Sequence, residues 1–265
     1  MPTYKDIAYI ADDNPKHTLD IYLPDISSGT VPLVIFIHGG AWRDGDKSEC
    51  EVLGPGLVSK SQGTLAVAAI NYRLSQRSAD SIRHPAHLHD AMQAVRFLIC
   101  NENDYPGKQL VDVSNTYIVG HSAGAHLAAL MVLSASDRLD CLANIKGILG
   151  AGGIYDIPGL LELYPDYADF IDMAFDPAQH QEASPQHVAE CRHAGAKHIR
   201  FLIVNSTGDS LIASSHAASF ASQLIRTGCT DVELVVRELG THFTMLDHEQ
   251  FWKLVVAFVA YGLED

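Results

Sequence analysis

The chain has 265 residues, of which 47% are hydrophobic and 19% are charged. This composition excludes a disordered chain and a peptide-sized disulfide scaffold, and the length allows a large core with an enclosed pocket. The formal net charge is −14, from 18 Lys and Arg against 32 Asp and Glu. No run of three basic residues occurs, so nucleic acid and anionic membrane surfaces are poor partner candidates.

Targeting signals and cysteines give further expectations. Residues 1–16 contain no apolar stretch of the kind that marks a secretory signal, and no window approaches the length of a membrane-spanning helix. We therefore expect a cytoplasmic protein. The cysteines are odd in number, scattered and without a C-x-x-C pair, which favours reduced thiols over a disulfide framework. They are Cys50, Cys100, Cys141, Cys191 and Cys229.

The pattern of strands predicts a mostly parallel sheet. Tyr4–Ile10 and Thr18–Leu23 flank a turn-forming sequence and predict an N-terminal antiparallel hairpin at the sheet edge. Six later runs are almost continuously apolar, as expected for parallel strands covered on both faces. These runs are Val31–Ile37, Leu65–Asn71, Thr116–Val119, Gly147–Ala151, Arg200–Asn205 and Val232–Val236.

Helical patterns alternate with these strands, which predicts βαβ units and a doubly wound α/β fold. The predicted helices cover about Cys50–Gln62, Pro85–Cys100, Ala123–Ala135, Ser214–Thr227 and His248–Tyr261. The stretch 154–198 is too long for one crossover and is rich in aromatic residues. Because about 45 residues would struggle to bury a core of their own, we expect a small helical cap inserted into one domain spanning residues 1–265.

The sequence Gly120-His121-Ser122-Ala123-Gly124 carries the first chemical signal. It follows a predicted strand and precedes a predicted helix, which is the context of a nucleophile elbow. The sharp turn would place Ser122 in a strained backbone conformation at a helix N-terminus, where developing negative charge is favoured. We predict that Ser122 is a nucleophile.

A second signal is His38-Gly39-Gly40-Ala41-Trp42, at the end of the strand Val31–Ile37. Two glycines there allow backbone amides to turn into a cleft. We predict an oxyanion hole formed by the amides of Gly39, Gly40 and Ala123. An ordinary glycine turn is the alternative. His38 is expected to hold the loop by hydrogen bonding, and Trp42 either lines the pocket or packs beneath it.

An acid and a base are expected after the serine, in that order. Asp209 follows the strand Arg200–Asn205, and His242 follows the last predicted strand. Both positions lie where parallel strands end and functional loops gather. We predict His242 as the base and Asp209 as its partner, with Glu238 and Asp231 as the rival acids.

Other candidate sites are weaker. His84, His87 and His89 cluster in sequence but would not share one helical face, so a polar helix start is favoured over a metal site. No G-x-G-x-x-G or P-loop sequence is present, so we expect no metal and no cofactor. The expected partner is a small-molecule substrate, and a homodimer is compatible with the sequence.

With these motifs in this order, the chain resembles the α/β-hydrolase superfamily, in particular the esterase and lipase branch with an HGG-type oxyanion loop. Asn71–Ser75 (NYRLS) is similar to a segment common in that branch. Two other stretches, Gly153–Asp156 with Tyr164–Tyr167 and Leu239–His242, resemble fungal-type kynurenine formamidases.

This resemblance implies hydrolysis of N-formyl-L-kynurenine to L-kynurenine and formate by an acyl-enzyme route. It implies Ser122 as nucleophile, Asp209 as acid and His242 as base. We expect Trp42, His121, Tyr155 and Phe243 to contact the substrate. A carboxylesterase acting on short-acyl or aryl esters uses identical machinery and stays open as an alternative, as does a ligand-binding protein of this fold without turnover.

Overall fold

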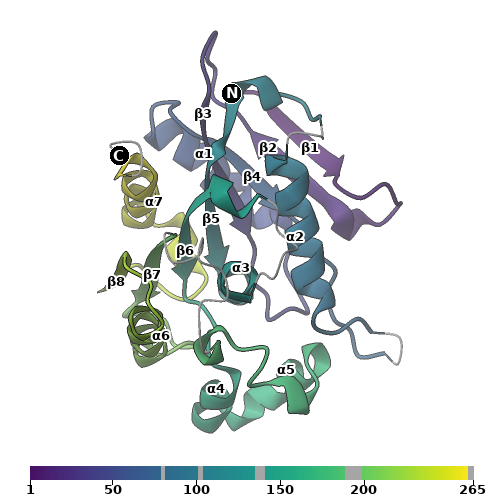
Figure 1. The fold of residues 1–265 in the computed structure, drawn as a ribbon, viewed down its shortest axis with the longest axis vertical. Helices are drawn as coiled ribbons and strands as arrows, with labels where there is room; N and C mark the ends of the chain where they lie inside the picture. The colour runs from purple at the N-terminus through teal and green to yellow at the C-terminus, as the bar shows by residue number, and fades with distance from the viewer. Residues whose placement is uncertain (79–80, 101–103, 135–140, 189–198, 262–265) are drawn as a thin grey trace.

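The computed structural model describes residues 1–78, 81–100, 104–134, 141–188 and 199–261. In this part of the chain eight strands form one sheet in the order β1-β2-β4-β3-β5-β6-β7-β8 (Figure 1). The strands are β1 (Thr3–Ala8), β2 (Thr18–Tyr22), β3 (Val31–Ile37), β4 (Ala66–Ile70), β5 (Val111–His121), β6 (Ile145–Ala151), β7 (Arg200–Ser206) and β8 (Val232–Arg237).

The strand directions match the expectation of a parallel sheet with an antiparallel hairpin. Strand β2 pairs antiparallel with both β1 and β4, and the pairs from β4 through β8 are all parallel. All six predicted apolar strands and the hairpin are confirmed. Strand β5 begins at Val111, earlier than predicted. The sequence did not indicate this start because polar residues such as Asp112 and Ser114 interrupt the apolar pattern in the first part of the strand.

Helices cover both faces of the sheet (Figure 1). They are α1 (Cys50–Lys60), α2 (Ala86–Ile99), α3 (Ala123–Ser134), α4 (Ile157–Leu163), α5 (Ala168–Ala174), α6 (Ser214–Arg226) and α7 (Glu249–Tyr261). Helices α1 and α7 share one hydrophobic cluster with the sheet, and α2, α3 and α6 share the other.

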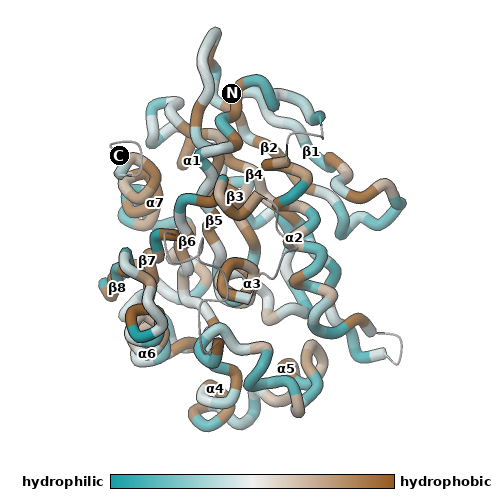
Figure 2. The backbone as a smooth tube through the Cα atoms, in the orientation of Figure 1, coloured by the Kyte–Doolittle hydropathy of each residue, from teal (hydrophilic) through white to brown (hydrophobic). Residues whose placement is uncertain are grey.

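Helix α3 lies at the centre of the second layer. Residues 123–133 are all buried, and Figure 2 shows this helix and the central strands mainly in brown, the hydrophobic colour. A helix that is apolar on all sides has no solvent face and is held by packing throughout. The start of α3 is thereby fixed firmly against the end of β5, where the predicted nucleophile lies.

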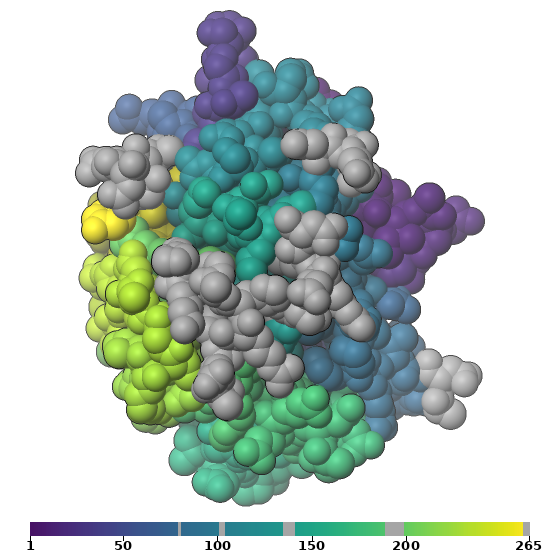
Figure 3. Space-filling model, viewed as in Figure 1, coloured from purple at the N-terminus to yellow at the C-terminus, as the bar shows by residue number. Residues whose placement is uncertain are grey.

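The predicted cap region contains two short helices beyond the carboxyl ends of the strands. Helices α4 and α5 lie together at one end of the molecule, and the space-filling view shows their green surface closing that end (Figures 1 and 3). Asp156 caps α4 by accepting a hydrogen bond from the Gly159 amide. Residues 189–198 of the predicted cap lie outside the described residues.

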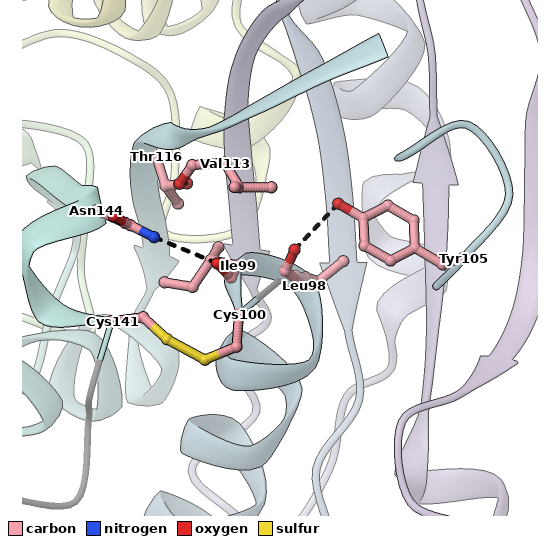
Figure 4. The surroundings of a disulfide bond; sticks show 8 residues. All are labelled: Leu98, Ile99, Cys100, Tyr105, Val113, Thr116, Cys141 and Asn144. Carbon is pink, nitrogen blue, oxygen red and sulfur yellow. Dashed lines mark hydrogen bonds between the residues drawn. A yellow bond between two sulfur atoms is a disulfide. The ribbon is translucent and has the colours of Figure 1, made fainter. Parts of the chain in front are cut away.

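The expectation of reduced cysteines is wrong for one pair. Cys100, after α2, and Cys141, ahead of β6, form a disulfide with a Cα–Cα distance of 6.2 Å (Figure 4). The two residues are 41 positions apart in sequence. They meet because the return connections from α2 and α3 enter the neighbouring strands β5 and β6 at the same edge. Cys50 is a free buried thiol, and Cys191 lies outside the described residues.

None of the described helices combines the length and apolar character needed to cross a membrane.

Candidate active site

Ser122 stands on a sharp turn between β5 and α3. Its φ is +52°, a left-handed conformation that is rare for residues other than glycine. The Ser122 amide donates to the Ala151 carbonyl at 2.9 Å, which ties the turn to β6. A Cβ on Gly124 would lie 2.0 Å from the Ile37 carbonyl oxygen, so glycine is required where α3 passes β3. This is the geometry of a nucleophile elbow.

His242 and Asp209 are joined by a short hydrogen bond between His242 Nδ1 and Asp209 Oδ2, at 2.7 Å. They follow β8 and β7, which are parallel neighbours, so their loops meet at one edge of the sheet. Both side chains are buried, with exposed fractions of 5% and 0%. Asp209 Oδ1 accepts from the amides of Leu211 and Ile212 at 2.8 and 2.9 Å.

These contacts keep Asp209 ionised. Burial alone would raise the pKa of its carboxyl, but the hydrogen bond and charge of His242 and the two backbone amides lower that pKa below its usual value. An ionised Asp209 accepts the hydrogen bond from His242 Nδ1–H and fixes the orientation of the ring. The rival acids lie elsewhere: Glu238 accepts from Thr207 Oγ1, and Asp231 pairs with Arg200.

The backbone after β3 turns through three consecutive positive φ values. These are +90° at Gly40, +49° at Ala41 and +57° at Trp42. The Gly40 carbonyl accepts from the amides of Arg43 and Asp44, which closes the turn. Among the described residues no hydrogen bond is donated by the amides of Gly40 or Ala41, and both residues line the cavity that contains Ser122.

Of the three predicted oxyanion donors, Gly40 lines the cavity, whereas Gly39 and Ala123 are not among its lining residues. Ala41, next to Gly40, also lines the cavity. The Gly39 amide is already engaged with the carboxylate of Glu49. Ala123 is the first residue of α3, directly after Ser122, and its amide has no acceptor within the helix. The amides of Gly40, Ala41 and Ala123 are therefore candidate donors to an anion next to Ser122.

Buried aromatic residues hold this loop from below. Tyr72 stacks on His38 with ring centroids 4.4 Å apart, and its hydroxyl donates to the carbonyls of His38 and Gly39. Trp42 is fully buried and packs edge-on against His126 and Phe175, at 4.9 and 4.7 Å. His38 has the structural role predicted for it, and Trp42 packs beneath the loop and does not line the pocket.

The Ser122 cavity has a volume of about 320 Å³. Its lining combines the elbow, the loop after β3, the cap, and the loops after β6, β7 and β8. The lining residues are Gly40, Ala41, Arg43, Asp44, Ser122, Ile154, Tyr167, Phe170, Leu211, Ile212, His242 and Phe243.

Only one of the four predicted substrate contacts lies on this wall. Phe243 is 69% exposed and meets the His242 ring edge-on. Trp42, His121 and Tyr155 are buried and are not among the residues that line this cavity. Tyr155 is held there by stacking on Phe220 at 4.0 Å.

His121, next to the nucleophile, is buried for a different reason. Its Nε2 donates to the backbone carbonyl of His242 at 2.8 Å, and burial lowers its pKa to about 3. The ring is therefore neutral. It connects the elbow to the loop of the predicted base and is not among the residues that line the cavity.

Several cavity residues were not predicted as site residues: Ala41, Arg43, Asp44, Ile154, Leu211 and Ile212. A usable signal was present for most of them, because they lie within three residues of Trp42 or Asp209, in the loops after β3 and β7. In the histidine cluster, His87 bonds Ser75 Oγ at 2.9 Å and His84 stacks on Phe175. The described residues contain no group of three or more side chains arranged to hold a metal ion.

A mostly parallel eight-stranded sheet, a serine on a strained strand–helix turn and a His–Asp pair at the same sheet edge define an α/β-hydrolase. The chain belongs to the BD-FAE family, whose model matches residues 19–224. It is 32% identical to the kynurenine formamidase of Meyerozyma guilliermondii over 100% of this chain and 96% of that protein.

Other relatives and solved structures agree with this class. A probable isoprenylcysteine alpha-carbonyl methylesterase of Arabidopsis thaliana is 29% identical over 87% of this chain, which spans 49% of the plant protein. A truncated carbohydrate esterase from gut microbiota has the same fold, with a TM-score of 0.78 at 19% identity, covering 98% of this chain and 96% of that one. The chain is a hydrolase of the esterase and formamidase type.

Proposed function

We propose that this protein hydrolyses N-formyl-L-kynurenine to L-kynurenine and formate, with Ser122 as nucleophile. The observation that carries the proposal is the similarity to the kynurenine formamidase of Meyerozyma guilliermondii, at 32% identity across the whole chain. Similarity over the full length includes the cap, which forms part of the pocket wall, and is not confined to the shared hydrolase motifs.

The cavity suits a compact aryl substrate. Its volume of about 320 Å³ is at the small end of ligand pockets, which span roughly 300–1,000 Å³. Tyr167 and Phe170 of the cap region and Phe243 beside His242 supply aromatic surface for an aryl leaving group. A formyl group is a single carbon, so the acyl side needs little room next to Ser122.

In the first half of the reaction, His242 Nε2 takes the hydroxyl proton of Ser122 as Oγ attacks the formyl carbon. The carbonyl oxygen becomes an oxyanion facing the amides of Gly40, Ala41 and Ala123. The imidazolium of His242, paired with ionised Asp209, then returns the proton to the leaving anilide nitrogen. The C–N bond breaks, kynurenine leaves and a formyl-enzyme remains.

In the second half, His242 Nε2 removes a proton from water, which attacks the formyl carbon. The same amides stabilise the second oxyanion, and the proton returns to Ser122 Oγ as formate departs. One residue pair thus serves as base and acid in both halves, and no metal or cofactor takes part in these steps.

The test measures hydrolysis of N-formyl-L-kynurenine by the wild type and by Ser122→Ala. We expect turnover by the wild type and loss of at least about three orders of magnitude in the variant, with unchanged thermal unfolding. Glu238→Gln, which changes an exposed rival acid, serves as the matched control and keeps full activity. Turnover by Ser122→Ala at the wild-type rate would overturn the serine mechanism.

A second candidate is a carboxylesterase, favoured by the similarity to the plant methylesterase over 87% of this chain. The machinery would be the same, and the leaving atom would be an ester oxygen. Comparing kcat/KM for N-formyl-L-kynurenine and p-nitrophenyl acetate separates the two activities. A marked preference for the ester, with no formamide cleavage, would favour the esterase.

A further inference from the structure

Arg43 is the cationic side chain on the wall of the Ser122 cavity. It comes directly after Trp42, whose buried ring fixes the loop, so its backbone position is set by the core. The Arg43 guanidinium carbon lies 5.0 Å from the centre of the Phe170 ring on the cap. This cation–π contact orients the guanidinium at the junction between the loop and the cap while leaving its edge available for hydrogen bonding.

The hydrogen-bonding capacity of this guanidinium is largely unused. Its nearest carboxylate is Asp169, with an Nη1–Oδ2 distance of 3.8 Å, which is too long for a hydrogen bond. Asp169 instead accepts a hydrogen bond from Arg77. Among the described residues, Arg43 side-chain nitrogens donate no hydrogen bond. Two guanidinium groups therefore share the carboxylate of Asp169, and the donors of Arg43 are not used by it.

Few other side chains on the wall can interact with a carboxylate. Apart from Asp44 and His242, the other lining side chains are apolar, aromatic or a hydroxyl. Asp44 is already engaged, because its Oδ1 accepts from the Gly45 amide at 2.8 Å. A planar guanidinium with free donors matches a carboxylate in two-pronged geometry better than any neutral acceptor.

We propose that Arg43 binds a carboxylate on the leaving-group side of the substrate and selects amino-acid-bearing formanilides over neutral ones. This inference rests on the proposed function, for which the leaving group carries an α-amino acid. Arg43 is a specificity residue in this role. It does not take part in bond breaking, so its loss raises KM for the carboxylate substrate more than it lowers kcat.

The test compares N-formyl-L-kynurenine with 2-formamidoacetophenone, which has the same formanilide and ketone but no amino acid. The substrate ratio is kcat/KM for N-formyl-L-kynurenine divided by kcat/KM for 2-formamidoacetophenone. We expect Arg43→Met to lower this ratio by roughly 10- to 100-fold, mostly by raising KM for N-formyl-L-kynurenine, since a charge-assisted pair is lost. Arg43→Lys keeps the charge without the planar fork and is expected to restore part of the ratio.

Arg83→Met is the matched control. Arg83 is an exposed arginine that does not line the Ser122 cavity. We expect this variant to keep the wild-type substrate ratio. A ratio that is unchanged in Arg43→Met, or reduced equally in Arg83→Met, would overturn the assignment.

A binding measurement separates this inference from the proposed function. Calorimetry with L-kynurenine and with 2-aminoacetophenone needs no turnover. We expect Arg43→Met to weaken binding of L-kynurenine by roughly 10-fold or more. The variant should therefore bind L-kynurenine and 2-aminoacetophenone with similar affinity. If the wild type binds L-kynurenine through Arg43 but does not cleave its formyl derivative, the proposed function fails and the carboxylate site stands. If Arg43→Met binds L-kynurenine as tightly as the wild type, the site fails whatever the activity.

Discussion

His121 Nε2 donates a hydrogen bond to the backbone carbonyl of His242 at 2.8 Å, across 121 positions of sequence. His121 is the residue before Ser122, and His242 is the ring bonded to Asp209. The elbow and the loop after β8 are therefore tied directly to each other. Because burial lowers the pKa of His121 to about 3, the ring is neutral and the tie persists through the physiological pH range.

We predict that His121→Leu lowers kcat by roughly 10- to 100-fold with little change in KM, because the His242 loop loses its anchor to the elbow. His121→Gln can supply a donor from a side-chain amide and is expected to recover part of the rate. Steady-state kinetics on the preferred substrate checks this. A KM effect as large as the kcat effect would contradict a positioning role and indicate that His121 contacts substrate.

Gly40→Ala is expected to reduce both stability and activity. Gly40 has a φ of +90°, and an added Cβ would lie 2.1 Å from the Asp44 carbonyl oxygen. Gly29 has a similar φ of +85° but nothing within 4 Å, so Gly29→Ala isolates the cost of the backbone conformation.

In urea unfolding we expect Gly29→Ala to cost about 1–2 kcal/mol. Gly40→Ala should cost roughly 1–3 kcal/mol more, because overpacking adds to that cost. It should also lose most of its turnover as the amides of Gly40 and Ala41 are displaced. Equal costs at the two positions would contradict the close contact with Asp44.

Stability is expected to fall as the pH drops below about 6.5, because several histidines are buried as neutral rings. Burial lowers the pKa of His38 to about 4 and those of His87, His121 and His126 to about 3, from an ordinary value of 6.5. Below pH 6.5 the unfolded chain takes up these protons and the folded chain does not, so unfolding is favoured. Each such group removes about 2 kcal/mol by pH 5.

The measurement is the free energy of unfolding between pH 7.5 and pH 5 for the wild type and His126→Gln. Glutamine does not titrate, so the variant should lose less stability over this range than the wild type. Its own packing cost is read at pH 7.5, where the histidine is neutral in both states. Parallel curves for the two proteins would show that His126 does not contribute.

The disulfide between Cys100 and Cys141 is expected to contribute substantially to stability. It closes a loop with a sequence separation of 41, for which chain entropy gives about 4 kcal/mol. Urea unfolding with and without reductant should show a lower midpoint for the reduced wild type. The double variant Cys100→Ser, Cys141→Ser should match the reduced protein and show no response to reductant. A wild type that is insensitive to reductant would mean that the two thiols are not bonded in solution.

The fold could be predicted because its signals are local. Continuous apolar runs such as Val31–Ile37, alternating with amphipathic segments, have few structural solutions other than a parallel sheet covered by helices. The meeting of Asp209 and His242 followed from the same logic, since the ends of neighbouring parallel strands lie at one edge.

The finer features could not be predicted because they depend on backbone direction and on distant packing. Three successive positive φ values shape the loop after β3 so that Ala41, and not Gly39, is among the residues that line the cavity. Trp42 is buried because Phe175, from the cap, packs against it. The partner of Cys100 lies beyond two further elements of the fold, and no local pattern indicates that it is Cys141.

The distribution of the cavity lining along the chain has a consequence for biosynthesis. The wall begins at Gly40 and is completed only by His242 and Phe243, with contributions from the ends of β3, β5, β6, β7 and β8. A chain emerging from the ribosome can form the early strands but lacks His242, the proposed proton acceptor, until nearly all of it has been made. Under the proposed mechanism, activity therefore arises late in folding, after β8 has docked and His242 has reached Asp209 through contacts of long sequence separation.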